Sequence, residues 1–462
     1  MNSQESFDVI VIGSGAAGTS AAVSACETAK DLGKTLKVGI VERGDESAWG
    51  GNSRWTTANF QMTKVDQVNP TLYEDLLEDS QGRMDKEYAS IIVKEAAAAV
   101  GWVCGKGVVF EKLDLPTSRP RMAPVGGGYA VIAALRSEAE KLGVSVLLES
   151  TAFKFSQNDD GKIDGIWVRH RDGKTERLAS RATILAGGGF EGNLEMLTRY
   201  ISKEATSVRW EVPGTKMHMG ECINMALEAG AAPSGEYSGF HGFAVDVRSD
   251  SPAPPPILGL AYGILVNIEG VRFTDEGVPF DSLESISRNI LQQPLNRAFL
   301  IMDHKARSLP NFDARIGGDI PPIEAASLEE LSKLIHVPSD TLLDTVKKFN
   351  VAVQTTEPTK LDEMQTTGIF PRKSSRALSI DRAPYYCYPV GSTVEFTWGG
   401  IATDTRARVL ATNDAPIPGL YAAGEMVGLN YHHYTGGSSV MRSLVFGRIA
   451  GSEAVKQVAK EP

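Results

Sequence analysis

Cysteine is scarce in this chain of 462 residues, which contains four: Cys26, Cys104, Cys222 and Cys387. They lie far apart and include no C-x-x-C pair, a spacing that argues against both a zinc site and a redox-active dithiol. Free thiols are typical of proteins in a reducing compartment, so the cysteines predict a cytoplasmic protein without disulfide bonds.

Long apolar runs and blocks of basic residues are also missing. No apolar run reaches the ~18 residues that a membrane span needs. The polar stretch 1–6 leads straight into an apolar run, so we expect no signal peptide. The chain has 57 acidic and 47 basic residues, a net charge of −10, which argues against nucleic acid or an anionic membrane surface as a partner. A small anionic substrate stays compatible, because a binding site can be basic inside an acidic protein.

Glycine, in contrast, is abundant: the chain has 46, about 10% against a usual share of roughly 7%. Glycines in pairs and triplets mark places where the backbone turns with positive φ or comes close to another group. The clusters are Gly13-Gly15-Gly18, Gly50-Gly51, Gly126-Gly127-Gly128, Gly187-Gly188-Gly189, Gly399-Gly400 and Gly436-Gly437. A chain of this length predicts two or three domains around these turns.

The first cluster lies in a pattern that predicts a dinucleotide-binding βαβ unit. An apolar strand over 7–12 is followed by the three glycines, a helix over 19–31 and a second strand over 36–41 that ends at Glu42. In such a unit Gly13 allows the tight turn, Gly15 lets a pyrophosphate approach, and Gly18 lets the helix pack closely on the strand. The helix N-terminus attracts phosphate, and Glu42 can accept hydrogen bonds from the adenosine ribose. NAD and FAD both fit this fingerprint.

Two later glycine turns favour a flavin. The apolar strand over 181–185 runs into Ala186 and the triplet that follows it, and the strand over 419–423 runs into Gly424-Glu425. A glutamate in that place could bind the ribityl hydroxyls of a flavin. After Gly436-Gly437, Ser438 and Ser439 begin a helix with one apolar stripe. Its first N–H groups and its dipole would stabilise the flavin edge that becomes negative on reduction.

Between these nucleotide-binding ends the composition changes, with frequent prolines and two short predicted helices that begin near Ser327 and Ser339. We interpret this stretch as an inserted domain. The sequence therefore predicts an α/β fold in which a Rossmann-type FAD-binding domain, over 1–205 and 376–462, is interrupted by an α+β capping domain over 206–375.

The order of these motifs, with Gly270-Val271-Arg272-Phe273-Thr274-Asp275-Glu276 between them, resembles the fumarate reductase/succinate dehydrogenase flavoprotein superfamily over nearly the whole chain. The resemblance implies FAD as the cofactor and a mobile capping domain. Some members link the flavin covalently to a histidine, near whose place this chain has Trp55, so we expect non-covalent FAD. With the motifs above, the resemblance implies that FAD is bound by Gly13, Gly15, Ala16, Ala17, Gly18, Glu42, Arg43, Gly50, Gly51, Asn52, Ser53, Thr57, Ala58, Gly127, Gly128, Ala152, Ala186, Gly187, Gly188, Gly424, Glu425, Gly437, Ser438, Ser439 and Val440.

The chain departs from fumarate reductases at the substrate site. Their proton-donating arginine is replaced by Phe280, and Tyr434 stands where they have a substrate-binding arginine. The histidine of their H-x-M-G-G segment has no counterpart in 394–400. We therefore do not expect fumarate reduction. The chain is more similar to the FAD-dependent tricarballylate dehydrogenase group, and more weakly to 3-ketosteroid dehydrogenases, which also use tyrosines beside the flavin.

The resemblance implies that a carbon–carbon bond beside an electron-withdrawing group is desaturated, which needs a base, an oxyanion stabiliser and a positioned flavin. Tyr434 is either a proton carrier or an aromatic wall contact. His241 stands where relatives bind a substrate carboxylate, although an isolated histidine is often structural. At least one of His432 and His433 is expected to face the cavity, and we select His433. Arg119 could grip a carboxylate, as could Arg121, or be a solvated loop charge.

We expect no metal site, and an external electron acceptor, because the sequence carries no haem, iron–sulfur or second flavin motif. The sequence predicts an FAD-dependent dehydrogenase that acts on CH–CH groups, on a small substrate such as a tricarballylate-like polycarboxylic acid. One alternative is a dehydrogenase, oxidase or ene-reductase of a cyclic ketone or natural-product intermediate. Another is a flavin-binding subunit that has lost catalysis, to which Phe280 points.

Overall fold

The computed structural model describes residues 6–115, 117–210, 212–354 and 358–461. The chain forms two compact units, which we call the nucleotide unit (Met1–Met196, Pro213–Gly239 and Phe396–Pro462) and the inserted unit (Leu197–Val212 and Phe240–Glu395). The predicted domain borders at 205 and 375 stay predictions. Among the described residues, every helix is too short or too polar to cross a lipid bilayer.

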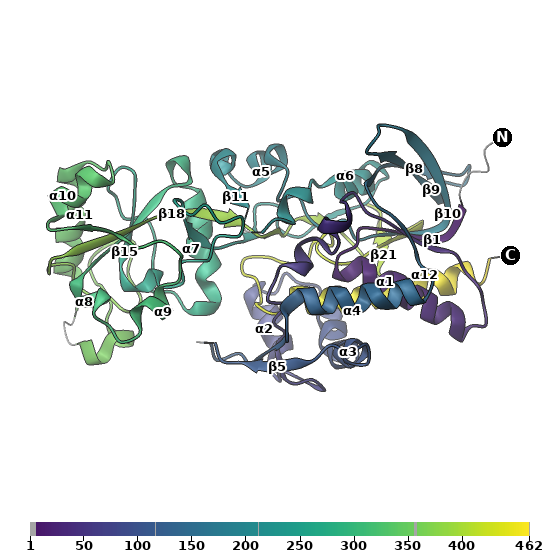
Figure 1. Ribbon diagram of the computed structural model, residues 1–462, viewed down its shortest axis with the longest axis horizontal. Helices are drawn as coiled ribbons and strands as arrows, with labels where there is room; N and C mark the ends of the chain where they lie inside the picture. The colour runs from purple at the N-terminus through teal and green to yellow at the C-terminus, as the bar shows by residue number, and fades with distance from the viewer. Residues whose placement is uncertain (1–5, 116, 211, 355–357, 462) are drawn as a thin grey trace. The chain divides into compact units, whose positions relative to one another are not determined.

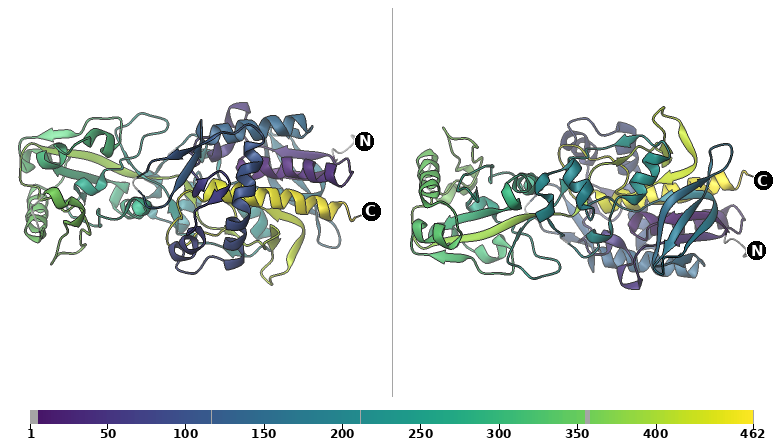
Figure 2. Two further views of the ribbon diagram at one scale, coloured as in Figure 1. Left: turned by 90° about the horizontal axis from the view of Figure 1, so that it is seen from below. Right: turned by 90° about the horizontal axis from the view of Figure 1, so that it is seen from above.

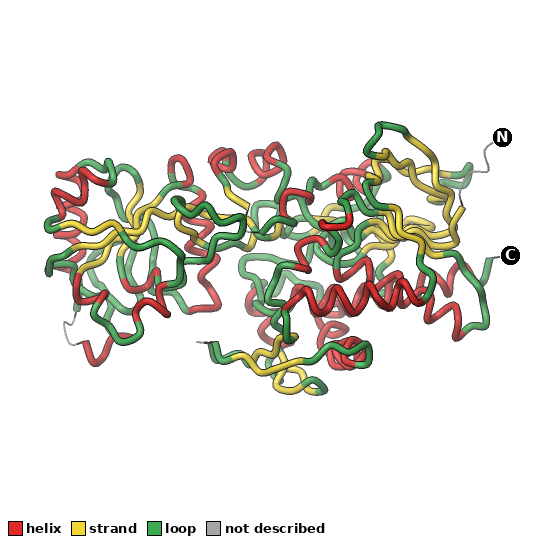
Figure 3. The backbone as a smooth tube through the Cα atoms, viewed as in Figure 1, coloured by secondary structure: helices red, strands yellow, loops and turns green. Residues whose placement is uncertain are grey.

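The nucleotide unit is built on an eight-stranded sheet (Figures 1 and 3). Six of its strands follow the order β21-β22-β10-β1-β2-β7, and the other two, β9 and β8, form an antiparallel extension in which β9 pairs with β10. The central strand β1 (Ser6–Ile12) runs parallel to β2 (Val38–Val41) on one side and to β10 (Thr175–Leu185) on the other. Val9, Ile10 and Val11 of β1 are fully buried. A strand that is apolar on both faces is typical of a parallel sheet covered by helices.

Two helices of this unit pack unusually closely. α1 (Ala16–Asp31) and α12 (Ser439–Val458) run side by side (Figure 2). A Cβ atom at Gly447 of α12 would lie 2.4 Å from the carbonyl oxygen of Ala17, and one at Gly451 would lie 2.1 Å from that of Ala21. Glycine on α12 is therefore required for this contact, which brings the N-termini of both helices to the same sheet edge.

The other helices and strands of the nucleotide unit surround this core. α5 (Leu194–Tyr200) leads the chain into the inserted unit. The remaining elements are β3 (Met62–Lys64), β4 (Gln67–Val68), α2 (Leu72–Asp79), α3 (Lys86–Cys104), β5 (Phe110–Leu113), β6 (Arg121–Pro124), α4 (Gly127–Lys141), β7 (Ser145–Leu147), β8 (Ser150–Gln157), β9 (Ile163–His170), α6 (Glu221–Glu228), β12 (Pro233–Ser234), β19 (Phe396–Thr397), β20 (Gly400–Ile401), β21 (Arg408–Leu410) and β22 (Pro416–Ala422).

The inserted unit has its own six-stranded sheet, in which the long strand β18 (Tyr385–Val394) pairs with four others. Apolar side chains of this sheet and of the helices around it form one buried core. Its elements are β11 (Arg209–Trp210), β13 (Phe240–His241), β14 (Ala244–Asp246), β15 (Ile264–Asn267), α7 (Leu283–Leu291), β16 (Ala298–Asp303), α8 (His304–Arg307), α9 (Phe312–Ile316), β17 (Ile323–Ala325), α10 (Leu328–Leu334) and α11 (Ser339–Ala352). The predicted α/β fold class is confirmed, and the helices expected near Ser327 and Ser339 are α10 and α11.

A buried ion cluster supports the inserted unit. Glu276 is fully buried and accepts hydrogen bonds from Arg272 at 2.7 Å and from the backbone N–H of Leu265 at 2.7 Å. The ammonium group of Lys373 lies 3.8 Å from the same carboxylate. Burial lowers the pKa of Lys373 to about 8. The segment around Arg272 therefore has a structural role inside this unit.

Candidate functional site

The predicted glycine turns meet at one edge of the nucleotide unit, because the carboxyl ends of parallel strands lie together. The turn after β1 touches the turn after β10, since a Cβ atom at Gly13 would lie 2.3 Å from the carbonyl oxygen of Ala186. A Cβ atom at Gly15, at the start of α1, would make only ordinary van der Waals contacts, the nearest with Ser53 Oγ at 3.6 Å. This glycine-lined edge fits a pyrophosphate that approaches the backbone.

Glu42 is held beside this turn at the end of β2. One carboxylate oxygen accepts hydrogen bonds from the N–H of Ser14 at 3.0 Å and from its hydroxyl at 2.7 Å, and the other accepts from the N–H of Gly44 at 2.7 Å. Arg43 turns aside to the carboxylate of Glu221, at 2.5 Å, and to the carbonyl of Met217. The ribose contact predicted for Glu42 and the FAD contact predicted for Arg43 stay predictions.

The loop over 50–58 lies against the same edge. Ser53 Oγ accepts a hydrogen bond from the N–H of Ala16 at 3.2 Å, which connects this loop to the first turn of α1. A Cβ atom at Gly128 would lie 1.8 Å from the carbonyl oxygen of Ser53, and one at Gly127 would lie 3.0 Å from that of Thr56. The structure therefore brings Thr56 and Thr57 against the α4 glycines, and the FAD contacts predicted for Thr57, Ala58, Gly127 and Gly128 stay predictions. Ala152 is buried in β8.

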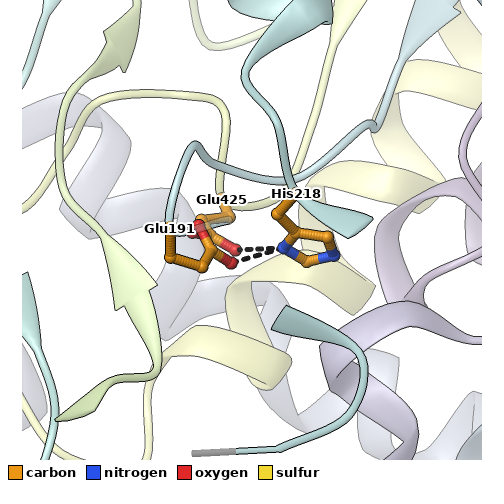
Figure 4. Close-up of side chains that lie close together, drawn as sticks. All are labelled: Glu191, His218 and Glu425. Carbon is orange, nitrogen blue, oxygen red and sulfur yellow. Dashed lines mark hydrogen bonds and ion pairs between the residues drawn. The ribbon is translucent and has the colours of Figure 1, made fainter. Parts of the chain in front are cut away.

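Three titratable side chains form a cluster at the turn after β10, shown in Figure 4. Nδ1 of His218 is hydrogen-bonded to Glu191 and lies 3.7 Å from a carboxylate oxygen of Glu425. Glu191 also accepts a hydrogen bond from Nδ2 of Asn52 at 2.9 Å, and Glu425 accepts one from the N–H of Thr397 at 3.0 Å. The exposed fractions of the three side chains are 0% for Glu191, 13% for His218 and 15% for Glu425.

Burial controls the protonation of this cluster. The loss of water raises the pKa of Glu191 to about 8. Burial also raises the pKa of Glu425 well above its ordinary value, and the nearby charge of Glu191 adds to that effect. Burial lowers the pKa of His218, so the imidazole is neutral. Two facing carboxyl groups in such a place share a proton at neutral pH, and the cluster can hold or release that proton.

The same donor set contains atoms that metals bind, since its three ligand atoms lie within 4.8 Å of one another. Hydrogen bonds among the three side chains and from Asn52 and Thr397 already satisfy these atoms. The cluster therefore needs no cation to be satisfied, and the expected lack of a metal stays a prediction.

The glycine triplet makes room for this cluster. A Cβ atom at Gly188, where φ is +74°, would lie 2.7 Å from Nδ1 of His218. A Cβ atom at Gly189 would lie 2.2 Å from Oε1 of Glu425 and 2.6 Å from Oε2 of Glu191. Sequence reasoning found Glu425 but missed Glu191 and His218. The sequence contained one signal for these residues, Gly189, because a simple strand-to-helix turn does not require a third glycine.

Tyr434 lies at the start of α12, 7% exposed. Its phenolic oxygen accepts a hydrogen bond from the N–H of Ser439, in the first turn of the helix, at 3.1 Å. Its ring packs edge-on against Phe396, with 4.9 Å between ring centroids, and these two rings cluster with Trp398. The hydroxyl is thus placed at the positive end of a helix dipole, and the ring lies in an aromatic wall.

Arg442, one turn further along α12, is a residue that sequence reasoning missed. Its side chain is buried, 4% exposed, and its Nε and Nη1 atoms have no hydrogen-bond partner within the part of the chain that the structure describes. The titratable groups that interact with its charge are Tyr88, Tyr434 and Glu425. In the sequence, Arg442 follows Ser439 by three residues, so the two positions lie on the same face of the helix, and this spacing was the available signal.

The other predicted catalytic residues lie in different surroundings. His241 belongs to the inserted unit, with Nε2 at 3.4 Å from a carboxylate oxygen of Glu395, and burial lowers its pKa to about 4. Arg119 forms ion pairs with Asp79 at 2.7 Å and with Asp75 at 3.4 Å. The ring of His433 contacts that of His432, with 4.2 Å between centroids. The roles predicted for these residues stay predictions.

Comparisons with known proteins show what this chain is similar to. A family model described as "FAD binding domain" matches residues 8–440. The chain is 28% identical over 466 residues to a fumarate reductase (cytochrome) of Shewanella frigidimarina, covering 99% of this chain and 78% of that protein. It is 27% identical over 507 residues to a vinyl phenol reductase of Lactiplantibacillus plantarum, covering 98% and 97%. The crystal structure of a 3-ketosteroid delta1-dehydrogenase from Sterolibacterium denitrificans is similar with a TM-score of 0.76, 21% identity and coverage of 98% and 100%.

Proposed function

Because the chain belongs to the family of FAD binding domains, we propose that it desaturates a carbon–carbon bond beside a carboxylate or carbonyl group of a small substrate. The prediction of FAD as the cofactor is confirmed, as is membership of the fumarate reductase/succinate dehydrogenase superfamily. The protein is an FAD-dependent oxidoreductase that acts on carbon–carbon bonds. The substrate and the physiological direction belong to the proposal.

The placement of Tyr434 carries the proposal. Its hydroxyl lies at the N-terminus of α12, where the N–H of Ser439 donates to it. Tyr434 takes the acidic proton from the carbon next to the activating group, and a hydride leaves the neighbouring carbon, so that the single bond becomes a double bond. Bound FAD supplies the acceptor for that hydride. The N–H groups of the first turn of α12 stabilise negative charge that develops next to them.

The residues around the sheet edge would hold FAD without a covalent bond. Glu42 fits the adenosine ribose, the turn over 13–15 with the N-terminus of α1 fits the pyrophosphate, and Glu425 fits the ribityl chain. Trp55, near the place of the linking histidine in some relatives, is 45% exposed and offers no nucleophile.

A polycarboxylic acid similar to tricarballylate is the first substrate class that we propose, and the carboxylate-binding role predicted for His241 belongs to the same proposal. An external electron acceptor and a cytoplasmic location belong to the same proposal.

A specific observation favours a second candidate substrate, a cyclic ketone. Tyr434, Phe396 and Trp398 form a buried aromatic cluster, and flat apolar molecules pack well against such surfaces. A ketone needs one oxyanion stabiliser and no cationic anchor. A solved relative with a TM-score of 0.76 is a 3-ketosteroid dehydrogenase, which is consistent with this alternative.

Anaerobic titration of the holoenzyme tests the proposal. Tricarballylate and a 3-ketosteroid are added separately, and the flavin absorbance near ~450 nm is followed, since its loss reports reduction of the cofactor. We expect one class to bleach the flavin, and Tyr434→Phe to slow the single-turnover reduction by roughly 10²–10⁴-fold with unchanged flavin content. Normal reduction by dithionite, with no bleaching by either class or by related acids and ketones, would instead support an inactive flavin-binding subunit.

A further inference from the structure

We propose that His218 binds FAD directly: its Nε2 atom accepts a hydrogen bond from a hydroxyl group of the cofactor, and Glu191 is the positioning residue that leaves the Nε2 lone pair available. His218 was not among the FAD-binding residues predicted from the sequence. This role rests on the proposed function, which places FAD along the glycine turns of the nucleotide unit.

The imidazole ring of His218 lies between two of the glycine turns that are predicted to bind FAD. A Cβ atom at Gly51 would lie 3.3 Å from Nε2, and one at Gly188 would lie 2.7 Å from Nδ1. Nε2 is on the side of the ring that points away from the two carboxyl groups (Figure 4). Because Gly51 and Gly188 place no side chain over the ring, a cofactor that follows the two turns can approach it.

Hydrogen bonds hold the ring in this place before a cofactor binds. The N–H of His218 donates to the carbonyl oxygen of Thr215 at 3.0 Å, and its own carbonyl oxygen accepts from the N–H of Gly192 at 2.8 Å. The side chain is held as well, because Nδ1 is hydrogen-bonded to Glu191. A side chain that is already fixed loses little conformational freedom when it binds a ligand.

The contacts of Glu191 determine which ring nitrogen of His218 carries the hydrogen. Oε1 of Glu191 is bonded to Nδ1 and also accepts a hydrogen bond at 2.9 Å from Nδ2 of Asn52, an amide nitrogen that can only donate. The hydroxyl of Thr215 donates to Oδ1 of Asn52 at 3.4 Å, in agreement with this orientation of the amide. Oε1 is therefore the acceptor oxygen, and a proton on Glu191 belongs on Oε2. Nδ1 donates to Oε1, so the neutral ring has its lone pair on Nε2.

The Nε2 lone pair lacks a donor within residues 6–115, 117–210, 212–354 and 358–461. A polar atom that is enclosed on binding costs free energy unless a hydrogen bond satisfies it. The pyrophosphate of FAD offers only acceptor oxygens, so it does not fit, whereas the hydroxyls of the ribityl chain and of the adenosine ribose can donate. Nδ1 of His218 lies 3.7 Å from Oε2 of Glu425, which the proposed function places beside the ribityl chain.

Cofactor affinity of the full chain tests this role without a substrate. Asparagine at position 218 places its amide nitrogen near the position of Nδ1 and no atom near that of Nε2, whereas the amide oxygen of glutamine reaches the position of Nε2. By equilibrium dialysis we expect His218→Asn to weaken FAD binding by about 3–10-fold and His218→Gln to restore most of it. His170→Asn is the matched control, because His170 also lies in the nucleotide unit but its ring nitrogens contact Ser150 at 3.0 Å and Glu176 at 2.7 Å.

Fragments of the cofactor show which hydroxyl His218 binds. Riboflavin carries the ribityl chain, ADP carries the adenosine ribose, and lumiflavin carries the ring system alone. If His218→Asn weakens riboflavin together with FAD, the partner is a ribityl hydroxyl, and if it weakens ADP together with FAD, the partner is a ribose hydroxyl. An unchanged affinity for FAD, or an equal loss for lumiflavin, overturns the inference.

The position of the ring hydrogen is measured in the wild-type holoenzyme, which keeps the inference testable even if His218→Asn does not fold. Nitrogen NMR of protein labelled at histidine distinguishes a ring nitrogen that carries hydrogen from one with a lone pair, and the signals missing in His218→Gln belong to His218. We expect the hydrogen on Nδ1, and a hydrogen on Nε2 would contradict the assignment. Failure of every acid and ketone to bleach the flavin would refute the proposed desaturation and leave these binding results unchanged.

Discussion

Replacement of Glu191 by glutamine should make the stability of the protein less dependent on pH. Glu191 is fully buried, and the loss of water raises its pKa from 4.5 to about 8. The folded protein therefore holds a proton on Glu191 between those values, whereas the unfolded chain has released it. Stability is fully present below pH 4.5 and is lost as the pH rises toward 8.

The structure sets the size of this effect. One extra proton in the folded state gives a slope of about 1.4 kcal/mol per pH unit. Over the window of roughly 3.5 units from 4.5 to about 8, the slope amounts to about 5 kcal/mol as an upper value for this group alone. For a unit of about 300 residues, the slope corresponds to a fall in Tm of about 2 °C per pH unit. Glutamine carries no titrating proton, so the variant loses this contribution, together with the part of the raised Glu425 pKa that Glu191 causes.

The assay is thermal unfolding of the holoenzyme at pH values from about 5.5 to 7.5, followed by circular dichroism and flavin fluorescence. Glu140→Gln on α4 is the matched control, because that side chain is 60% exposed. We expect the Tm of wild type and control to fall together with rising pH, and that of Glu191→Gln to fall less. Equal slopes in all three proteins would show that folded Glu191 is ionised and would refute the argument from burial.

Three further predictions follow from other contacts. Gly189→Ala should lower FAD affinity by at least about tenfold, because the added Cβ atom would lie 2.2 Å from Oε1 of Glu425. Equilibrium dialysis of flavin measures this affinity, and Gly101→Ala is the control, because a Cβ atom at Gly101 has no neighbour within 4 Å. Glu276→Gln should destabilise the protein by about 3–5 kcal/mol, since it leaves Arg272 and Lys373 buried without their carboxylate. Urea unfolding measures this loss of stability, and Glu269→Gln at an exposed position is the control. Acid precipitation should release all of the flavin into the supernatant, and a yellow pellet after washing would contradict non-covalent binding.

Local patterns in the sequence predicted the parts of the molecule that depend on neighbours along the chain. The βαβ unit has a fixed spacing, so the predicted helix over 19–31 and the strand over 36–41 lie within three residues of α1 and β2. Gly13 and Glu42 could be assigned because their roles follow from that spacing. The same holds for α12, whose apolar stripe and glycine-serine start are local signals.

The missed residues depend on contacts between distant segments. His218 reaches Glu191 and Glu425 from a different loop, and no periodicity connects the three positions. Arg442 lies on α12, and the sequence alone does not show that its Nε and Nη1 atoms are buried without a hydrogen-bond partner among the described residues, since that depends on how α3 packs against α12. The sequence could not show whether Arg119 binds substrate or forms ion pairs within the protein, because its partners Asp75 and Asp79 belong to a separate segment.

The surroundings of Tyr434 bear on which substrate this protein takes. The resemblance to fumarate reductases puts Tyr434 where those enzymes have a substrate-binding arginine, and the Tyr434 ring packs against Phe396 with 4.9 Å between ring centroids. A phenol carries no positive charge, so a carboxylate substrate needs a cationic anchor on another side chain. A ketone needs no such anchor, so bleaching by a ketone alone would identify the aromatic cluster of Tyr434, Phe396 and Trp398 as the substrate-binding surface.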